Sequence, residues 1–276
     1  MVWLWLVVNV VGVCMAVFPS FGDIREREEI AGYPVAEVHF ETGDGIEIAA
    51  WYVHAEGDRA VILLPGIDAT RNNMTERAAY YRKRGFATIQ PDFRGTGESA
   101  PALVTMGWNE RHDLAAAEAF LRDRGYSEIG VHGVSMGAAA ICYGLQAEPD
   151  WAFVVLESCY DTIDNAFDNR LDMAGVPHLI ALPMRVLTPI VMGVTSGELR
   201  PVEYLRRCTA PTLIMAGDAE PELRVAETEA LFDQCGASVK RMHLFEGGRH
   251  ENFMRRYGDE YVDMVSGFLA MVEAGA

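Results

Sequence analysis

The stretch Gly133-Val134-Ser135-Met136-Gly137 decides the fold. It follows the apolar run Ile129–Val131 and precedes the small-residue run Ala138–Leu145, an order typical of a strand followed by a helix. A serine with a glycine two positions away on each side, at such a junction, is typical of a nucleophile elbow. The turn is so sharp that a Cβ at either glycine would collide with neighbouring chain. Ser135 is therefore the candidate nucleophile, although ordinary glycine-rich turns can share this pattern.

A serine hydroxyl needs a neighbouring base to accept its proton. His250 is the candidate base, because it lies in the glycine-rich loop after the strand-like run Val239–Phe245 and before the last expected helix. The alternative is a solvated loop histidine. We interpret the other six histidines as structural or surface residues: His39, His54, His112, His132, His178 and His243.

The third group must be a carboxylate that orients the imidazole. Asp218 and Glu220 both follow the apolar run Pro211–Ala216. Either carboxylate could instead cap the helix expected to begin near Leu223. The residues alone leave this choice open.

With these three groups in this order, the chain resembles the α/β-hydrolase family, in its single-domain, esterase-like serine hydrolase branch. In that branch the loop after the seventh strand commonly has a glycine, two residues and then the acid, which implies Glu220, with Asp218 as the alternative acid. The segment Asp92–Ser99 is similar to the D-x-R-G-x-G-x-S segment of many members. The resemblance implies that Arg94 is a scaffold residue.

The segment Pro65-Gly66-Ile67-Asp68 resembles the oxyanion loop of the family, with Pro65 in place of the usual histidine. The family geometry implies that the backbone N–H groups of Ile67 and Met136 form the oxyanion hole. A carboxylate that faced a developing oxyanion would oppose the transition state. We therefore expect Asp68 to point outward or to cap the next helix near Asn72.

The apolar runs alternate with helical stretches, as a mostly parallel, doubly wound sheet requires. We expect an α/β-hydrolase fold with one catalytic domain over residues 34–276, preceded by a linker at 21–33. Expected strands are Val35–Glu41 and Glu47–Val53, as an opening hairpin, then Ala60–Leu64, Ala87–Gln90, Glu128–His132, Ala152–Glu157, Thr212–Ala216 and Val239–Phe245. Expected helices are Asn73–Arg84, Asn109–Arg122, Met136–Gln146, Arg224–Cys235 and Tyr257–Val272.

Residues 160–207 form too long an interval for the single crossover that the alternation requires. Its apolar part, Val176–Val194, contains Pro177, Pro183 and Pro189, which predict short pieces in place of one long helix. In the family that the chain resembles, an insertion here forms a cap over the nucleophile. The resemblance implies a small helical cap after the sixth strand, whose apolar inner face would favour small to medium, uncharged acyl groups. The alternative is simple packing on the edge of the sheet.

Residues 1–20 form an apolar N-terminal segment. Val2–Phe18 would span roughly 25 Å as a helix, which is short but adequate for a bilayer. No Lys or Arg precedes it, unlike a secretory signal, and Arg25 and Arg27 after it favour the cytoplasmic face. We expect membrane association through residues 2–18. A buried helix, a homodimer contact and a soluble or secreted protein are the alternatives.

Composition narrows the partners of the chain. With 40 acidic and 23 basic residues, the net charge is −17, which disfavours nucleic acid as a ligand. The five cysteines lack the paired spacing of metal sites, and no phosphate-binding loop occurs, so we expect neither metal nor cofactor. A disulfide between Cys208 and Cys235 stays open.

These observations predict a serine hydrolase that cleaves carboxylic esters through an acyl-enzyme intermediate, with Ser135, His250 and Glu220 as its triad. A peptidase or a thioesterase would use the same triad, and a lyase or a cofactor-free haloperoxidase could share the scaffold. A non-catalytic, membrane-tethered binding protein is an alternative of a different class, which Pro65, Asp68 and Glu220 keep open.

Overall fold

The computed structural model describes residues 24–275 of the chain. The strands are β1 (Glu29–Ile30), β2 (Tyr33–Pro34), β3 (Ala36–Glu41), β4 (Glu47–Val53), β5 (Arg59–Leu64), β6 (Ala87–Pro91), β7 (Glu128–Val134), β8 (Phe153–Glu157), β9 (Thr212–Gly217) and β10 (Lys240–Phe245). The α-helices are α2 (Thr75–Arg82), α3 (Glu110–Arg122), α4 (Met136–Gly144), α5 (Ile163–Ala174), α6 (Leu182–Met192), α7 (Pro201–Leu205), α8 (Val225–Gln234), α9 (Phe253–Tyr257) and α10 (Asp259–Gly275), and the 3-10 helices are η1 (Arg71–Met74) and η2 (Leu145–Ala147).

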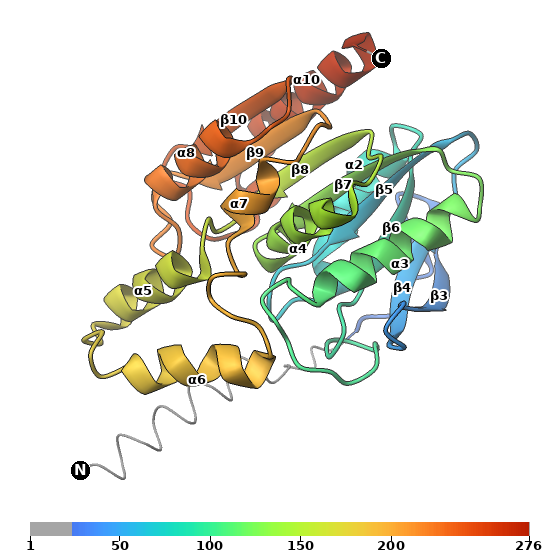
Figure 1. The fold of residues 1–276 in the computed structure, drawn as a ribbon. Helices are drawn as coiled ribbons and strands as arrows, with labels where there is room; N and C mark the ends of the chain where they lie inside the picture. Colours follow the sequence, from blue (N-terminus) through green and yellow to red (C-terminus); the bar gives the residue numbers. More distant parts are fainter. Residues whose placement is uncertain (1–23, 276) are drawn as a thin grey trace.

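One eight-stranded sheet organises the molecule, in the order β10-β9-β8-β7-β5-β6-β4-β3 (Figure 1). The six strands β10, β9, β8, β7, β5 and β6 pair in parallel with one another, in that order. β4 pairs antiparallel with both β3 and β6. The opening hairpin and the mostly parallel sheet are therefore confirmed. The eight strands predicted from the sequence all occur, with ends that differ by at most two residues.

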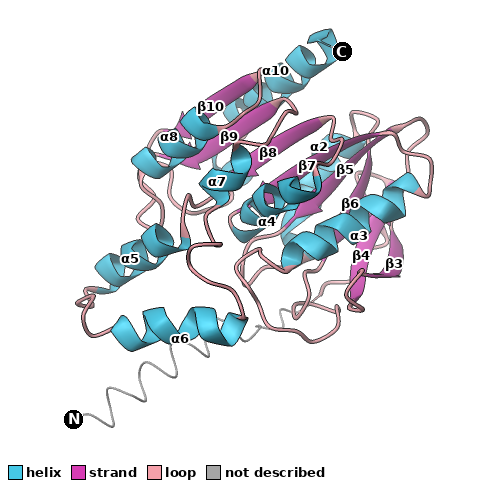
Figure 2. Ribbon diagram, in the orientation of Figure 1, coloured by secondary structure: helices cyan, strands magenta, loops and turns pink. Residues whose placement is uncertain are grey.

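The helices cover both faces of this sheet, and Figure 2 shows the two helical layers with the sheet between them. Successive side chains of a strand point to opposite faces. In β5, Ala60, Ile62 and Leu64 accordingly join the core beneath α3, α4, α7 and α8, whereas Val61 and Leu63 join the core beneath α2, α9 and α10. Both faces are buried, which explains why the central strands are apolar throughout instead of alternating.

The cap lies between β8 and β9, where α5 and α6 stand beyond the carboxyl ends of the parallel strands (Figure 1). The expectation that all three prolines divide the apolar stretch was wrong for Pro189, which lies inside α6. Pro183 belongs to the first helical turn, where no amide partner is needed. Pro189 removes one later hydrogen bond, and only three residues follow it before α6 ends at Gly193 in a left-handed conformation (φ 68°).

The segment expected to be a linker contributes to the fold as well. β1 and β2 pair as a two-stranded antiparallel sheet, and Ile30 is buried in the core that contains Trp51. The apolar segment at 2–18 lies outside the described residues. Within residues 24–275, no helix has the length and apolarity needed to cross a bilayer.

The cysteines of residues 24–275 are all free and buried: Cys142, Cys159, Cys208 and Cys235. The disulfide left open between Cys208 and Cys235 is therefore not formed. The Cys208 thiol instead contacts the Thr212 hydroxyl at 3.3 Å. These side chains pack as small apolar groups in the core.

Candidate active site

The elbow places Ser135 between β7 and α4 at the carboxyl edge of the sheet. Its backbone has φ 52° and ψ −113°, a conformation that non-glycine residues rarely adopt. A Cβ at Gly133 would lie 2.5 Å from the backbone of Gly137, and a Cβ at Gly137 would lie 2.5 Å from the carbonyl oxygens of Leu64 and Pro65. The expected steric need for both glycines is confirmed.

His250 reaches the elbow from the loop after β10. Its Nε2 lies 3.2 Å from Ser135 Oγ, and its Nδ1 lies 2.7 Å from Glu220 Oε2. The structure thus brings together three side chains that are 85 and 30 positions apart along the chain, as a continuous hydrogen-bonded line. With Nδ1 protonated toward the carboxylate, Nε2 is free to accept the serine proton.

The two candidate acids occupy different environments. The Glu220 side chain is fully buried, and its Oε1 accepts hydrogen bonds from the Ser158 hydroxyl and the Gly217 amide, both at 2.7 Å. Asp218 is exposed, and its Oδ1 accepts the Gly247 amide at 2.7 Å. The geometry therefore puts Glu220 against the imidazole and leaves Asp218 to hold the loop that carries it.

Sequence reasoning missed Ser158 as a partner of the acid. It follows β8 directly and has a positive φ of 48°, which turns its side chain toward Glu220. A serine after a buried strand is too common to be singled out from the sequence. Ser158 fixes the carboxylate from the side opposite to His250, so it positions the acid.

The expected oxyanion residues lie on either side of the nucleophile, since Ile67 and Met136 line the same cavity as Ser135. Gly66 brings the β5 loop close, because a Cβ there would lie 3.4 Å from Ser135 Cβ. Asp68 is exposed, and the N-cap of the following helix η1 is Thr70. The role of the two amides stays a prediction.

A second group that the sequence did not reveal lies behind the elbow, around the buried side chain of Glu157 on β8. Its carboxylate accepts hydrogen bonds from Arg77 on α2 and Tyr261 on α10, and it contacts the ring of His132 on β7. The backbone carbonyl of Glu157 accepts the Ser135 amide at 2.7 Å. The support of the nucleophile is thus tied to β7 and to two helices on the far side of the sheet, α2 and α10.

Opposing effects set the ionisation of this group. Burial disfavours the charged form of Glu157, but the attraction of Arg77 and the contacts with His132 outweigh burial and hold the pKa of Glu157 below its ordinary value. Burial lowers the pKa of His132, so its ring is neutral near pH 7. The pair that carries charge is therefore Arg77 with Glu157.

Glu157→Gln is expected to lower the free energy of unfolding by about 3–5 kcal/mol at pH 7, because it leaves Arg77 buried without its counter-charge. A carboxylate whose pKa is lower in the folded than in the unfolded protein stabilises the fold when the pH is above the unfolded-state pKa. This stabilisation is lost as the pH falls towards the folded-state pKa. The difference in the free energy of unfolding between the native protein and Glu157→Gln should therefore become smaller below about pH 4.5. Urea titrations at several pH values measure this difference.

The matched control is Glu273→Gln, which removes an exposed partner of Arg59 and should leave stability nearly unchanged. A difference between Glu157→Gln and the native chain that stays constant down to about pH 3 would contradict this account of the pair.

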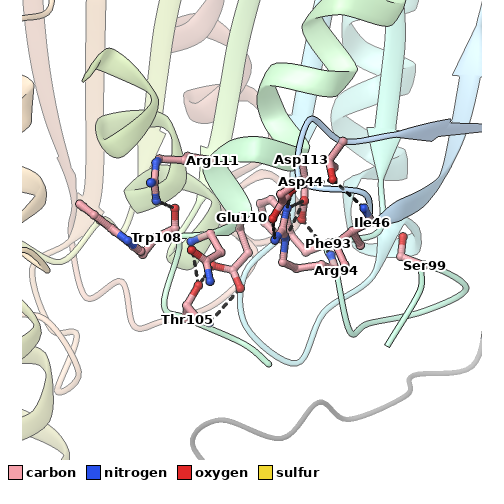
Figure 3. A network of polar contacts seen from close by, with 12 residues as sticks. Asp44, Ile46, Phe93, Arg94, Ser99, Thr105, Trp108, Glu110, Arg111 and Asp113 are labelled. Carbon is pink, nitrogen blue, oxygen red and sulfur yellow. Dashed lines mark hydrogen bonds and ion pairs between the residues drawn. The ribbon is translucent and has the colours of Figure 1, made fainter. Parts of the chain in front are cut away.

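The buried side chain of Arg94 belongs to a separate network, shown in Figure 3. Its backbone amide and its Nε both donate to Asp113 on α3, and its terminal nitrogens donate to Asp44 in the β3–β4 turn. Nearby, the buried carboxylate of Glu110 accepts the amides of Thr105 and Gly107. These bonds fix loops at the rim of the site, and none of them reaches Ser135.

An apolar cavity of about 310 Å³ opens on Ser135 beneath the cap. Its wall combines the elbow, the oxyanion loop and the inner sides of α5 and α6. The lining residues are Ile67, Met106, Ser135, Met136, Tyr160, Ile163, Asp164, Ala166, Phe167, Arg170, Leu171, Met184, Arg185, Thr188, Pro189, Met192 and Ser196. The cap therefore covers the nucleophile with mostly hydrocarbon side chains, as the resemblance implied.

A second, more polar hollow of about 430 Å³ adjoins the first. It shares Ile67, Ser135 and Arg170 with the apolar cavity and is the one that His250 lines. Ser135 thus lies between an apolar chamber and a polar chamber. In residues 24–275, no three His, Cys, Asp or Glu side chains are grouped so that they could hold a metal ion.

The fold of this chain is similar to that of known solved structures. An esterase of Pyrococcus furiosus has a TM-score of 0.78 at 20% identity, over 93% of this chain and 98% of its own. The chain has the α/β-hydrolase fold. An α/β-hydrolase of a Penicillium species has a TM-score of 0.67 at 16% identity, over 87% of this chain and 99% of its own.

A third similar structure is that of a bacterial membrane phospholipase A, with a TM-score of 0.64 at 16% identity, over 98% of this chain and 93% of its own. No protein-family model matches the sequence. No curated protein matches it either. At identities of 20% or less, these similarities establish the fold of the chain. The substrate must be inferred from the site.

Proposed function

We propose that the protein is a serine hydrolase that cleaves carboxylic esters of small to medium, uncharged acyl groups. The observation that carries this proposal is the hydrogen-bonded line from Ser135 through His250 to Glu220, which ends at an apolar cavity. The esterase and the phospholipase among the similar structures support ester cleavage in general terms.

In the proposed reaction, Ser135 Oγ attacks the ester carbonyl while His250 Nε2 accepts its proton. Buried Glu220 stabilises the imidazolium that forms, and the amides of Ile67 and Met136 would receive the oxyanion. His250 then returns the proton to the leaving alkoxide, which departs through the polar chamber that His250 lines. Water, activated by the same imidazole, releases the acid from the acyl-enzyme and restores Ser135.

The two chambers support an assignment of the two halves of the ester. The apolar chamber suits the acyl chain, because burial of each methylene is favourable by about 0.8 kcal/mol. The polar chamber, with Asn73, Arg170 and Asn252 in its wall, suits a hydrophilic leaving group. A peptidase or thioesterase would use the same line of residues, and parallel assays of esters, thioesters and amides with one acyl group separate them.

On p-nitrophenyl esters, kcat/KM is expected to rise with acyl length beyond acetate, by at most about fourfold per methylene, and then to fall when the cavity is full. Thr188→Phe, on the cavity wall, should move the maximum to a shorter chain by filling part of the volume. Initial rates over a series of chain lengths measure both effects. A flat profile for the native chain would contradict an apolar acyl pocket.

We also propose that residues 2–18 anchor the protein to a membrane, with the catalytic domain on the cytoplasmic face. The apolar sequence and the arginines that follow it support this placement. A non-catalytic tethered protein is the rival function. It would retain the fold and show no turnover on any activated ester.

A further inference from the structure

The cap carries an unusual concentration of exposed apolar side chains. Of the nine large hydrophobic residues that are exposed in residues 24–275, seven lie between Leu179 and Val191. Five of them belong to α6 and define what we term its outer face: Leu182, Val186, Leu187, Ile190 and Val191. Their exposed fractions range from 38% for Leu187 to 69% for Ile190.

The two sides of α6 are cleanly divided. The outer face recurs at intervals of four, through positions 182, 186 and 190 and through 187 and 191, which places it on one side of a helix. Of the other six positions, 184, 185, 188, 189 and 192 line the cavity at Ser135, and only Pro183 in the first turn does not. One helix therefore has the candidate acyl chamber on its inner side and an apolar surface on its outer side.

Charge is nearly absent from this part of the cap. Between Val176 and Val194 the sequence has one charged side chain, Arg185, besides the titratable His178. Arg185 forms ion pairs with Asp164 and Asp168 of α5, at 2.9 and 2.8 Å. The outer face is thus uncharged in a protein whose net charge is −17, and contiguous apolar surface of this kind marks an interaction site.

The size and place of this surface favour a lipid layer over a second protein chain. An eleven-residue helix is roughly 16 Å long, and one side of it is small beside the roughly 800 Å² that each partner buries in a stable protein interface. A lipid layer has no such minimum, since each apolar side chain that enters it adds to the affinity. A net charge of −17 also disfavours anionic lipids.

We propose that the outer face of α6 docks on the surface of a zwitterionic bilayer, and that the protein draws its substrate, a lipid ester with a medium acyl chain, from that bilayer. The substrate part rests on the proposed ester hydrolysis. An acyl chain that leaves the bilayer at α6 has only this helix to pass before it reaches the cavity. Docking thus lets the ester move between two apolar surroundings.

Docking is tested with an environment-sensitive nitrobenzoxadiazole label on Val186→Cys in the full chain carrying Cys14→Ser, because the other cysteines are buried. Phosphatidylcholine vesicles should raise the emission of this label and shift it to the blue. The matched label is Glu56→Cys, which is highly exposed before β5, at the edge of the sheet opposite the cap. It should report no change even if residues 2–18 hold the protein on the vesicle.

The substrate class is tested with Val186→Ser combined with Ile190→Ser, since neither side chain lines the cavity. Hydrolysis of a medium-chain phosphatidylcholine in vesicles should fall roughly tenfold or more as apolar contact is lost, while turnover of soluble p-nitrophenyl butyrate stays within about twofold. Tyr33→Ser, which removes an exposed aromatic ring outside the cap, should change neither rate.

Three results would overturn the proposal. Labels at 186 and 56 that respond alike to vesicles would remove docking through α6. Equal vesicle rates for the native and serine variants would do the same. A native dimer that the serine variant converts to a monomer in sedimentation, with no label response, would assign the face to a second copy. Intact docking without any turnover of the soluble ester would instead overturn the ester hydrolysis.

Discussion

Ser135→Ala is expected to lower kcat on a soluble p-nitrophenyl ester by about 10⁴- to 10⁶-fold, because the hydroxyl that forms the acyl-enzyme is lost. The fold should persist, since the serine side chain contributes only its contact with His250 among the described hydrogen bonds, whereas its backbone amide still bonds to Glu157. Steady-state rates with an accompanying thermal unfolding curve measure both expectations.

Fluorophosphonate labelling isolates the nucleophile from the rest of the site. The native chain should be labelled at Ser135, and Ser135→Ala should not be labelled. Ser158→Ala is the matched control, because Ser158 is a second buried serine near the site that bonds to Glu220. It should keep the label and lose at most about tenfold in rate, the cost of one hydrogen bond. A label that survives Ser135→Ala would exclude Ser135 from the proposed role.

Glu220→Gln is expected to lower kcat by about 10³- to 10⁴-fold, because an amide cannot stabilise the imidazolium or hold the ring in the required tautomer. Asp218→Asn is the matched control. Its carboxylate is exposed and accepts one backbone amide, so the change should cost no more than a few-fold. Both variants remove one negative charge within three residues of each other, and long-range electrostatic effects therefore cancel in the comparison.

Burst kinetics on a p-nitrophenyl ester complete this test. If Glu220 supports the base in both half-reactions, Glu220→Gln should slow the burst and the steady state together. A larger loss for Asp218→Asn than for Glu220→Gln would transfer the role of the acid to Asp218 and contradict the geometry.

The sequence predicted the sheet and the meeting of the main candidates because these depend on local patterns. Short apolar runs define buried strands, and the glycines at 133 and 137 are required by backbone contacts that any elbow of this shape makes. Parallel strands end at the same edge, so groups that follow β7, β9 and β10 meet there. The order of the elements was therefore enough to bring Ser135, His250 and the loop with Asp218 and Glu220 together, whereas the preference for Glu220 came from the family resemblance.

Other features depend on contacts that a sequence does not display. The group around Glu157 joins residues of four elements that are separated by up to 184 positions, from Arg77 to Tyr261. Only the three-dimensional structure shows that these polar side chains are buried together and form hydrogen bonds with one another. Pro189 is likewise tolerated inside α6 because the helix ends three residues later. The spacing of the prolines alone does not predict where the helix ends.

The group around Glu157 has a consequence for the folding of the nascent chain on the ribosome. Ser135 is synthesised 115 residues before the base at position 250 and 126 residues before Tyr261, whose hydroxyl donates to Glu157. A nascent chain can therefore contain the elbow before it contains His250, the proposed proton acceptor, or Tyr261, which bonds to Glu157. We expect such a chain not to hydrolyse esters, because the proposed reaction requires His250 as its base.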